Sequence, residues 1–552
     1  MKESQKAKHH AVAGKKAART AGDKSMRESN SGLNRIELNP EFRLALDLIE
    51  KTSRNVFVTG KAGTGKSTLL EYFRQNTKKQ VAVLAPTGVA ALNVRGQTIH
   101  SFFGFRPDIT LDKIKKVSPE KRALYKNLDM VIIDEISMVR ADLLDCAEKH
   151  LRMNGPFPKR LFGGVQMVFI GDLYQLPPVV TAAERPIFSG RYSTPYFFSA
   201  NLFSRLDFDM DMVELEKVYR QTDSEFIQLL NAIRNRSVTD EDILLLNQKM
   251  KPHFIPPKKQ FYIYLTSTNQ QAWKINQERL HSLKTPFFRY QGMMDGEFDV
   301  SALPADEVLE LKVDSQVMMV NNDRKGGWVN GTVGRVVSVP GEQEDGPILV
   351  ERQEGGTVSV KPYVWELFRY EYNERSKKIY TEPVGAFYQY PLRLAWAITI
   401  HKSQGKTFDR VVIDIGRGTF AHGQVYVALS RCTGFDGLVL KKEIHKKHIR
   451  MDYRVVQFLT RFQYKKADSK LSYAKKTEMI RSAIDHGRSL ETVYLKPNDT
   501  KTRRRILPRS VQIMEFKGRE FEGVKAFCFK RGEERVFRID RMLELKEIPD
   551  EK

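Results

Sequence analysis

The chain has 552 residues, of which 41% are hydrophobic and 29% charged, so it has the composition of a globular protein with about three or four domains. Its 91 Lys and Arg outnumber its 67 Asp and Glu, and the formal net charge of +24 favours a polyanionic partner, either nucleic acid or an anionic membrane surface. The sequence has no apolar run long enough to span a membrane, no apolar signal region near the N-terminus, and no CxxC pair among its three cysteines. We therefore expect a cytoplasmic protein without a membrane span or a four-cysteine metal site.

The first predicted segment is a basic tail. Residues 1–35 carry nine Lys and Arg against three Asp and Glu, and they contain no Ile, Phe, Tyr or Trp. Such a segment cannot bury enough apolar surface to offset its chain entropy, so we expect it to be disordered. Two interpretations stay open: a solubilising tail, or an arm that tethers DNA without sequence preference.

A glycine-rich loop follows the first strand-like run, Asn55–Thr59. It reads GKAGTGKS over Gly60–Ser67 and leads into a helical segment, which is the spacing of a phosphate-binding loop. Its backbone N–H groups would face the phosphates, with Lys66 on the β- and γ-phosphates and the Ser67 hydroxyl on Mg²⁺. A plain glycine turn would not explain Lys66 and Ser67 at these offsets. We predict an ATP site formed by Gly60, Ala62, Gly63, Thr64, Gly65, Lys66, Ser67 and Thr68.

Two carboxylates follow the next buried run, Met130–Ile133. A parallel strand delivers its last residues to the ligand edge of a sheet, so Asp134 and Glu135 are expected beside the phosphates. We predict that Asp134 holds the Mg²⁺ shell and that Glu135 takes a proton from the attacking water.

A third run, Val165–Ile170, ends in the loop Gly171–Pro178. An amide there can bond both a water and the γ-phosphate, so we predict that Gln175 senses whether that phosphate is present. Read alone, Gln175 is also compatible with an ordinary surface loop.

Two arginines in apolar contexts, Arg220 and Arg431, lie more than 150 residues beyond the glycine-rich loop. As arginine fingers from a second lobe they would stabilise the charge of the transition state across a cleft that closes on ATP. As surface residues they would only form ion pairs, and the residues alone leave both interpretations open.

Together these motifs resemble the 5′-to-3′ branch of superfamily 1 DNA helicases, and within it the petite-integration-frequency (Pif) group. The resemblance covers about residues 36–464 and keeps the order of the family's motifs. The matching segments are Gly60–Ser67, Ala85–Ala91, Thr98–Phe103, Asp134–Val139, Arg140–Glu148, Phe162–Gly164, Gly171–Pro178, Val218–Gln221, Thr399–Thr407 and Tyr426–Arg431.

The resemblance implies two RecA-like lobes with ATP and Mg²⁺ between them and single-stranded DNA across their top. Arg220 and Arg431 fall at the family's finger positions, and Gly405 is implied to line the nucleotide site. Hydroxyl, imidazole and Lys groups can grip phosphates, and one ring of the Phe102–Phe103 pair can stack on a base while the other packs in the core. The implied DNA contacts are Thr87, His100, Phe103, His401, Lys402 and Ser403.

One position departs from the family pattern. Its members place a glutamine that reads adenine upstream of the phosphate loop, where this chain has Phe42. We therefore expect stacking or backbone contacts to hold adenine, and Phe42 leaves the preference for ATP over other nucleotides open.

A β-rich, glycine-punctuated stretch interrupts the second lobe. Val317–Val320, Trp328–Val336 and Ile348–Val350 indicate short hairpins, and the stretch resembles the SH3-like subdomain of the Pif group. It would help to enclose the DNA strand, or it would be a rigid spacer.

The last part of the chain reads as a polar linker and a small β module. Residues 465–552 carry 23 Lys and Arg against 15 Asp and Glu, and Phe527–Arg541 resembles the WYL module, an Sm/SH3-like β-barrel. The namesake triplet is partial, because Val493 stands where Trp is expected. The resemblance implies ligand or single-strand sensing, and we favour a nucleic-acid face over a solvated strand face. Its basic residues are Arg503, Arg504, Arg505, Arg509, Arg519, Arg535, Arg538 and Arg541, of which Arg503 and Arg505 are the predicted DNA contacts.

The sequence thus predicts an α/β fold of two RecA-like lobes with a small β insert and a WYL-like domain. The predicted segments are 1–35 (tail), 36–184 (first lobe), 185–305 and 389–463 (second lobe), 306–388 (SH3-like insert), 464–476 (linker) and 477–552 (WYL-like domain).

The predicted function is an ATP-dependent, monomeric 5′-to-3′ DNA helicase in genome maintenance. Its expected partners are single-stranded and forked DNA, with quadruplex DNA and RNA–DNA hybrids as further candidates and no membrane. The alternatives are a DNA translocase that remodels bound proteins, and a nucleic-acid-sensing regulator that uses ATP as a switch. The paired Asp134 and Glu135 disfavour the switch, because a switch needs no catalytic base.

Overall fold

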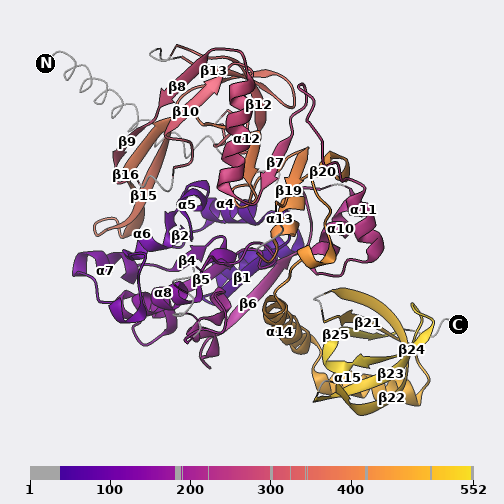
Figure 1. Ribbon diagram of the computed structural model, residues 1–552. Coiled ribbons are helices and arrows are strands. Elements are labelled where there is room, and N and C mark those ends of the chain that lie inside the picture. The colour runs from indigo at the N-terminus through magenta and orange to yellow at the C-terminus, as the bar shows by residue number, and fades with distance from the viewer. Residues whose placement is uncertain are drawn as a thin grey trace.

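The computed structural model describes residues 38–548 except 181–183, 185–187, 189, 222, 299–302, 324, 342–343, 345, 417–420, 498–499 and 517. The predicted basic tail, residues 1–35, lies outside the described residues. Figure 1 shows two α/β lobes, an insert of β-strands and a separate C-terminal β domain, which confirms the predicted fold class.

The first lobe is built on a six-stranded sheet in the order β3-β2-β4-β5-β1-β6, in which every neighbouring pair is parallel. Strands β1, β2, β4 and β5 are buried almost throughout because helices cover both faces. The strands are β1 (Asn55–Gly60), β2 (Val81–Ala85), β3 (Gln97–Thr98), β4 (Met130–Ile133), β5 (Gln166–Ile170) and β6 (Met210–Leu215). The helices are α3 (Pro40–Lys51), α4 (Lys66–Asn76), α5 (Gly88–Asn93), α6 (Ile99–Phe103), α7 (Pro119–Lys126) and α8 (Ala141–Asn154).

The outer strand β6 corrects the predicted boundary of the first lobe. The sequence division ended this lobe at residue 184, but β6 pairs with β1 from Asn55↔Met210 to Gly60↔Leu215. Because β6 is an edge strand, its residues are only partly buried and it lacks the continuous apolar run that marked the central strands.

The second lobe carries a four-stranded parallel sheet in the order β18-β7-β19-β20. Its strands come from two parts of the chain that flank the insert, as predicted. They are β7 (Ile263–Thr266), β18 (Ala397–Thr399), β19 (Val411–Asp414) and β20 (Leu438–Leu440). The helices are α10 (Ser224–Arg234), α11 (Asp240–Asn247), α12 (Asn269–Ser282) and α13 (Gln424–Leu429).

The insert consists of three small antiparallel sheets. It is larger than the predicted 306–388, because β8, β9 and β17 pair with strands inside that range. The strands are β8 (Phe287–Gln291), β9 (Met293–Gly296), β10 (Val308–Lys312), β11 (Gln316–Met319), β12 (Val333–Ser338), β13 (Ile348–Arg352), β14 (Thr357–Val360), β15 (Tyr363–Asn373), β16 (Lys378–Gln389) and β17 (Leu392–Leu394).

The long hairpin β15–β16 reaches the first lobe. The backbone N–H of Val83 donates to the Tyr370 hydroxyl at 3.0 Å, and the Tyr370 N–H donates to Gln97 Oε1 at 3.1 Å. Tyr370 is part of the first lobe's apolar core, so the insert is attached to both lobes.

Helix α14 (Tyr453–Lys470) returns from the second lobe to the first. Val455, Val456 and Leu459 are buried in the first lobe's core, and the Phe458 ring stacks on Phe198 with centroids 4.5 Å apart. The helix continues through residues 464–470, where the polar sequence predicted a linker; its last turns are polar because they lie on the surface.

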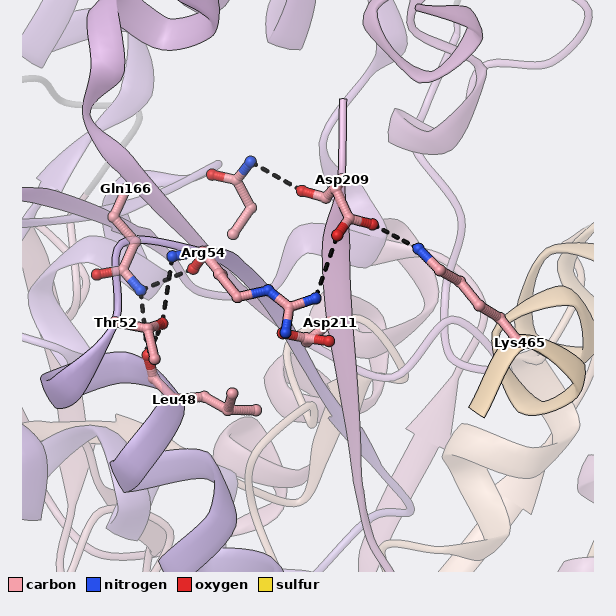
Figure 2. Close-up of polar contacts among 8 residues, drawn as sticks. Leu48, Thr52, Arg54, Gln166, Asp209, Asp211 and Lys465 are labelled. Carbon is pink, nitrogen blue, oxygen red and sulfur yellow. Dashed lines mark hydrogen bonds and ion pairs between the residues drawn. The ribbon is translucent and has the colours of Figure 1, made fainter. Parts of the chain in front are cut away.

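Figure 2 shows how the end of α14 meets the first lobe. Lys465 of α14 and Arg54 approach Asp209 from opposite sides, at 2.5 and 3.1 Å, and Arg54 also pairs with Asp211 at 3.0 Å. These side chains are largely exposed, so the pairs orient the helix more than they stabilise it.

The C-terminal domain is a five-stranded antiparallel sheet in the order β24-β23-β22-β21-β25, with one helix packed on it. Its elements are α15 (Tyr473–Asp485), β21 (Leu490–Leu495), β22 (Lys501–Phe516), β23 (Arg519–Cys528), β24 (Glu533–Arg538) and β25 (Met542–Glu547). Among the helices that the structure describes, none has the length and apolarity needed to cross a membrane.

Candidate active site

The glycine-rich loop lies between β1 and α4 and is shaped to surround an anion. Gly63 and Gly65 have φ of 81° and 85°, which favours glycine, and a Cβ at Gly63 would lie 2.5 Å from Cβ of Arg220. Gly65 begins α4 without a side-chain cap, so the first N–H groups of the helix remain for a ligand. Lys66 folds over the loop and donates from Nζ to the carbonyls of Gly60 and Lys61 at 2.8 and 2.9 Å. These donors fit a triphosphate.

Phe42 packs under this loop instead of facing a base. It is only 2% exposed, and a Cβ at Gly65 would lie 3.0 Å from its ring. Asn39 caps α3 by accepting from the Phe42 N–H and donates to the Tyr219 hydroxyl at 3.3 Å. Tyr219 is 46% exposed, with Lys217 Nζ 5.2 Å from its ring centre, and its backbone N–H donates to the Gly63 carbonyl at 2.8 Å, so a partly exposed aromatic ring stands beside the loop.

Asp134 and Glu135 follow β4, where parallel-sheet geometry predicted them. Glu135 has φ of 50°, an uncommon conformation for a residue with a side chain. Burial raises the pKa of both carboxyls; the Glu135 charge adds to the rise at Asp134, while Lys66 opposes both shifts. Ser67 lies exposed on the first turn of α4. One hydroxyl and one carboxylate, completed by phosphate and water oxygens, form an oxygen set that suits Mg²⁺.

Gln175 lies in the loop after β5 and is 8% exposed. Its amide donates to Asp172 Oδ2 at 3.4 Å, and its carbonyl oxygen accepts from Gln404 Nε2 of the second lobe at 3.5 Å. Gln175 is therefore held at the boundary between the lobes and is not a free surface residue.

The two predicted finger residues lie together although 211 positions separate them. Arg220 donates to the carbonyls of Ser430 and Gly405 at 3.4 and 3.2 Å. Arg431 is 1% exposed and donates to carbonyls of its own lobe, among them Ser403 at 3.3 Å. Burial and the neighbouring Arg220 lower the pKa of Arg431 to about 9. A buried guanidinium whose pKa is lowered by a neighbouring guanidinium suits a polyanionic ligand.

A tyrosine connects the second lobe directly to the phosphate loop. The Tyr426 hydroxyl, on α13, accepts from the Ala62 N–H at 3.0 Å. Burial raises the pKa of Tyr426 to about 12, with Asp172 adding to the rise, so the hydroxyl stays protonated. Tyr426 begins the matching segment Tyr426–Arg431, but nothing in the sequence indicates this contact.

The predicted DNA contacts fall into two groups. Thr87, His401 and Lys402 are exposed at strand ends, and His100 is half-buried nearby. Burial, with Arg140 beside it, lowers the pKa of His100, so its imidazole is neutral at neutral pH.

Phe103 and Ser403 correct the prediction. Phe103 is 4% exposed in an aromatic cluster with Phe102, Tyr125 and Phe105, which leaves no face for a base. Ser403 is 0% exposed, and its hydroxyl donates to the Ile400 carbonyl at 2.7 Å. Both residues support from inside the loops that carry the other predicted DNA contacts.

Arg503 and Arg505 lie on the outer face of β22. Arg503 pairs with Glu491 at 2.7 Å, and the Arg505 guanidinium lies 5.0 Å from the Phe529 ring centre. Between them Arg504 points inward, is 7% exposed, and has a buried Nη1 without a hydrogen-bond partner. Arg504 is one of four cations close enough to lower the pKa of Lys496, and the others are Arg531, Lys530 and Arg535; the predicted basic set did not include Lys496, Lys530 or Arg531.

Residues 37–243 match the model of the PIF1-like helicase family, and residues 475–547 match the WYL domain. The ATP-dependent DNA helicase Pif1 of Bdellovibrio bacteriovorus is 32% identical over 444 residues, which are 78% of this chain and 93% of that protein.

Solved structures agree. Bacteroides Pif1 with ADP-AlF4 is 39% identical with a TM-score of 0.71, covering 78% of this chain and 97% of that one. Bacteroides Pif1 bound to single-stranded DNA is 40% identical with a TM-score of 0.55, covering 77% and 96%. The Pif1 chain in a structure that describes DNA unwinding at forked duplex DNA by two coordinating Pif1 helicases is 39% identical to this chain. The match has a TM-score of 0.56 and covers 78% of this chain and 98% of that one. The chain belongs to the Pif1 family of ATP-dependent DNA helicases and carries a WYL domain after its helicase lobes.

Proposed function

We propose that this helicase moves 5′ to 3′ along single-stranded DNA and unwinds forked or structured DNA during genome maintenance. The observation that carries the proposal is the meeting of Arg220 and Arg431 beside the phosphate loop of the first lobe. A cleft that needs groups from both lobes couples the state of ATP to the distance between the lobes.

In the proposed reaction, the loop N–H groups and Lys66 hold the phosphates, and Tyr219 stacks on the base. Mg²⁺, held by Ser67 and Asp134, would neutralise charge on the β- and γ-phosphates. Glu135 accepts the proton of the attacking water, and Gln175 orients that water. Arg220 and Arg431 exchange their carbonyl partners for the γ-phosphate and stabilise the charge that develops there.

Thr87 and His100 belong to the first lobe, and His401 and Lys402 to the second. We infer that these residues are two grips on the DNA backbone, so that opening and closing of the cleft advances one grip past the other. Both lobes lie in one chain, and we propose that a monomer is sufficient for movement.

The C-terminal domain is proposed as an additional nucleic-acid contact. Burial and four nearby cations, Arg504 among them, lower the pKa of Lys496, which supports a concentration of positive charge around Lys496. Phosphate groups would relieve this repulsion.

Polarity is tested by unwinding of duplexes with a 5′ or a 3′ single-stranded overhang. We expect unwinding from the 5′ overhang, and unwinding from the 3′ overhang alone would overturn the polarity. Steady-state ATPase measured with and without single-stranded DNA separates the motor from a regulator, whose turnover would not rise with DNA.

Two variants test the chemistry in the same assay. Lys66→Ala should abolish turnover, because the phosphates lose their cation. Glu135→Gln should keep ATP bound but hydrolyse it at least about 100-fold more slowly, since the base is lost. Normal turnover in either variant would contradict the assigned role.

A further inference from the structure

Asp172 and Arg234 form a buried ion pair between the two lobes. Asp172 follows β5 of the first lobe, and Arg234 is the last residue of α10 in the second lobe. Arg234 Nη2 lies 3.3 Å from Asp172 Oδ1, and the two side chains are 3% and 0% exposed. The Arg234 guanidinium also lies 4.0 Å from the centre of the Tyr174 ring. Burial alone would lower the pKa of Arg234, but Asp172 and neighbouring groups outweigh it and raise that pKa.

Asp172 also shapes the loop that carries Gln175. Its Oδ1 accepts from the Tyr174 N–H at 3.1 Å, and its Oδ2 accepts from the Gln175 amide at 3.4 Å. The carboxylate that Arg234 neutralises is therefore the one that places Gln175.

The second lobe contacts this loop at another point. A Cβ at Gly423 would lie 2.2 Å from the Tyr174 carbonyl oxygen and 2.7 Å from that of Gln175, so only glycine permits the approach. The second lobe thus contacts this loop in two ways, through the backbone at Gly423 and through the guanidinium of Arg234.

We propose that Arg234 is a positioning residue that places Gln175 against the γ-phosphate only when the cleft is closed. When the lobes separate, Asp172 loses its cation, and the hydrogen bonds that hold the loop rearrange because a buried, unpaired carboxylate is unfavourable. Arg234 itself touches no substrate. The proposal rests on the role proposed for Gln175.

The test compares the full-length variants Arg234→Gln and Arg234→Lys with the control Arg236→Gln. Arg236 is exposed two residues further on, and its change removes the same charge. The measurements are kcat for ATP with single-stranded DNA, and the dissociation constants of Mg²⁺-ADP with and without AlF₄⁻, which supplies a transition-state mimic.

For Arg234→Gln we expect kcat to fall about 10- to 100-fold and most of the affinity gained from AlF₄⁻ to vanish. The affinity for ADP should stay within about two-fold, because ADP needs the phosphate loop and not the sensor loop. Arg234→Lys should recover part of both effects, since it keeps the charge but not the planar contact with Tyr174. The control should match the wild type. If Arg234→Gln does not fold, Arg234→Lys gives the same comparison with smaller changes.

A double variant checks that charge is the cause. Asp172→Asn with Arg234→Gln should turn over faster than Arg234→Gln alone, since no unpaired carboxylate remains. The proposal would be overturned if the effects of Asp172→Asn and Arg234→Gln on kcat simply multiplied in the double variant. It would also be overturned if Arg234→Gln kept the wild-type kcat and the wild-type gain in affinity from AlF₄⁻. Gln175→Ala separates the sensor role of Gln175 from the positioning role of Arg234. Normal turnover in Gln175→Ala would contradict the sensor role. Impaired turnover in Gln175→Ala together with normal turnover in Arg234→Gln would contradict only the positioning role.

Discussion

Lys501 of the C-terminal domain lies 3.2 Å from Glu214 and 3.0 Å from Glu216, at the end of β6. In the sheet, Glu214 is paired with Thr59 and Leu215 with Gly60, the first residue of the phosphate loop. Lys61 of that loop is also close enough for Glu214 and Glu216 to raise its pKa, although burial lowers it overall. The C-terminal domain is therefore attached at the end of β6, the strand that pairs with β1 and so lies next to the phosphate loop.

Reversal of this contact should loosen the C-terminal domain. Lys501→Glu replaces two attractions with two repulsions, and half-exposed pairs of this kind are worth about 0.5–2 kcal/mol together. Hydrogen–deuterium exchange of residues 214–221 should accelerate by about 2- to 30-fold. The control is Arg509→Glu, an exposed position of the same strand with the same change in charge. Equal exchange in both variants would show that Lys501 does not hold the domain.

The finger arginines should affect chemistry more than binding. Arg220→Ala and Arg431→Ala should each lower kcat about 10³-fold or more, because each removes a cation from the transition state. Affinity for a fluorescent ADP should change by less than about two-fold, since ADP lacks the γ-phosphate. Stopped-flow hydrolysis and equilibrium titration measure the two quantities. A parallel loss of ADP affinity would indicate that the arginines only hold the cleft together.

Phe103 should behave as a core residue. Phe103→Ala should lower the free energy of unfolding of the first lobe by about 3–5 kcal/mol, because it leaves a cavity in a packed aromatic cluster. Denaturant unfolding followed by circular dichroism measures this. Weaker DNA binding at unchanged stability would contradict the buried position.

Lys402 provides the opposite case. Lys402→Ala should leave stability nearly unchanged and weaken binding to DNA of any sequence. The slope of the logarithm of the binding constant against the logarithm of the salt concentration should become smaller by about one. Fluorescence anisotropy at several salt concentrations measures the slope. An unchanged slope would remove Lys402 from the DNA path.

Lys406 offers a test by pH. It donates to Asn330 Oδ1 in the insert, and Asn330 Nδ2 donates to Asn93 Oδ1 of the first lobe at 3.2 Å. Burial, with Arg393 nearby, lowers the pKa of Lys406 to about 8 from 10.5. Between these two pKa values the unfolded chain binds more protons than the folded chain. The loss of folding stability caused by burying the Lys406 ammonium is therefore complete below pH about 8 and disappears as pH rises toward 10.5.

Asn330→Asp should relieve that penalty by placing a negative charge beside the ammonium. Its melting temperature should exceed that of the wild type at pH 7, and the difference should shrink by pH 10. The control Asn373→Asp makes the same change in the exposed β15–β16 turn. A difference that does not vary with pH would show that Lys406 is not the titrating group.

The central strands and the phosphate loop could be read from the sequence because buried parallel strands form continuous apolar runs and GxxxxGKS is a specific spacing. The edge strand β6 could not, since its partly exposed residues resemble a loop. Arg234 was overlooked although a signal existed: it continues the apolar stripe Phe226, Leu229, Leu230 and Ile233 of α10, and a charge on such a stripe must be paired when buried. Its partner, Asp172, lies 62 positions away and belongs to the other lobe. Only the folded chain shows that pair.

Because α14 returns to the first lobe, the C-terminal domain that follows it should move with the first lobe and not with the second. Phe458, Lys465 and Lys501 all attach to the lobe that carries the phosphate loop. If the lobes open and close as proposed, the distance from this domain to Lys66 should stay constant, while its distance to His401 should change. A DNA strand held by the domain would then be stationary relative to the first lobe, and each cycle of ATP would draw the second lobe along it.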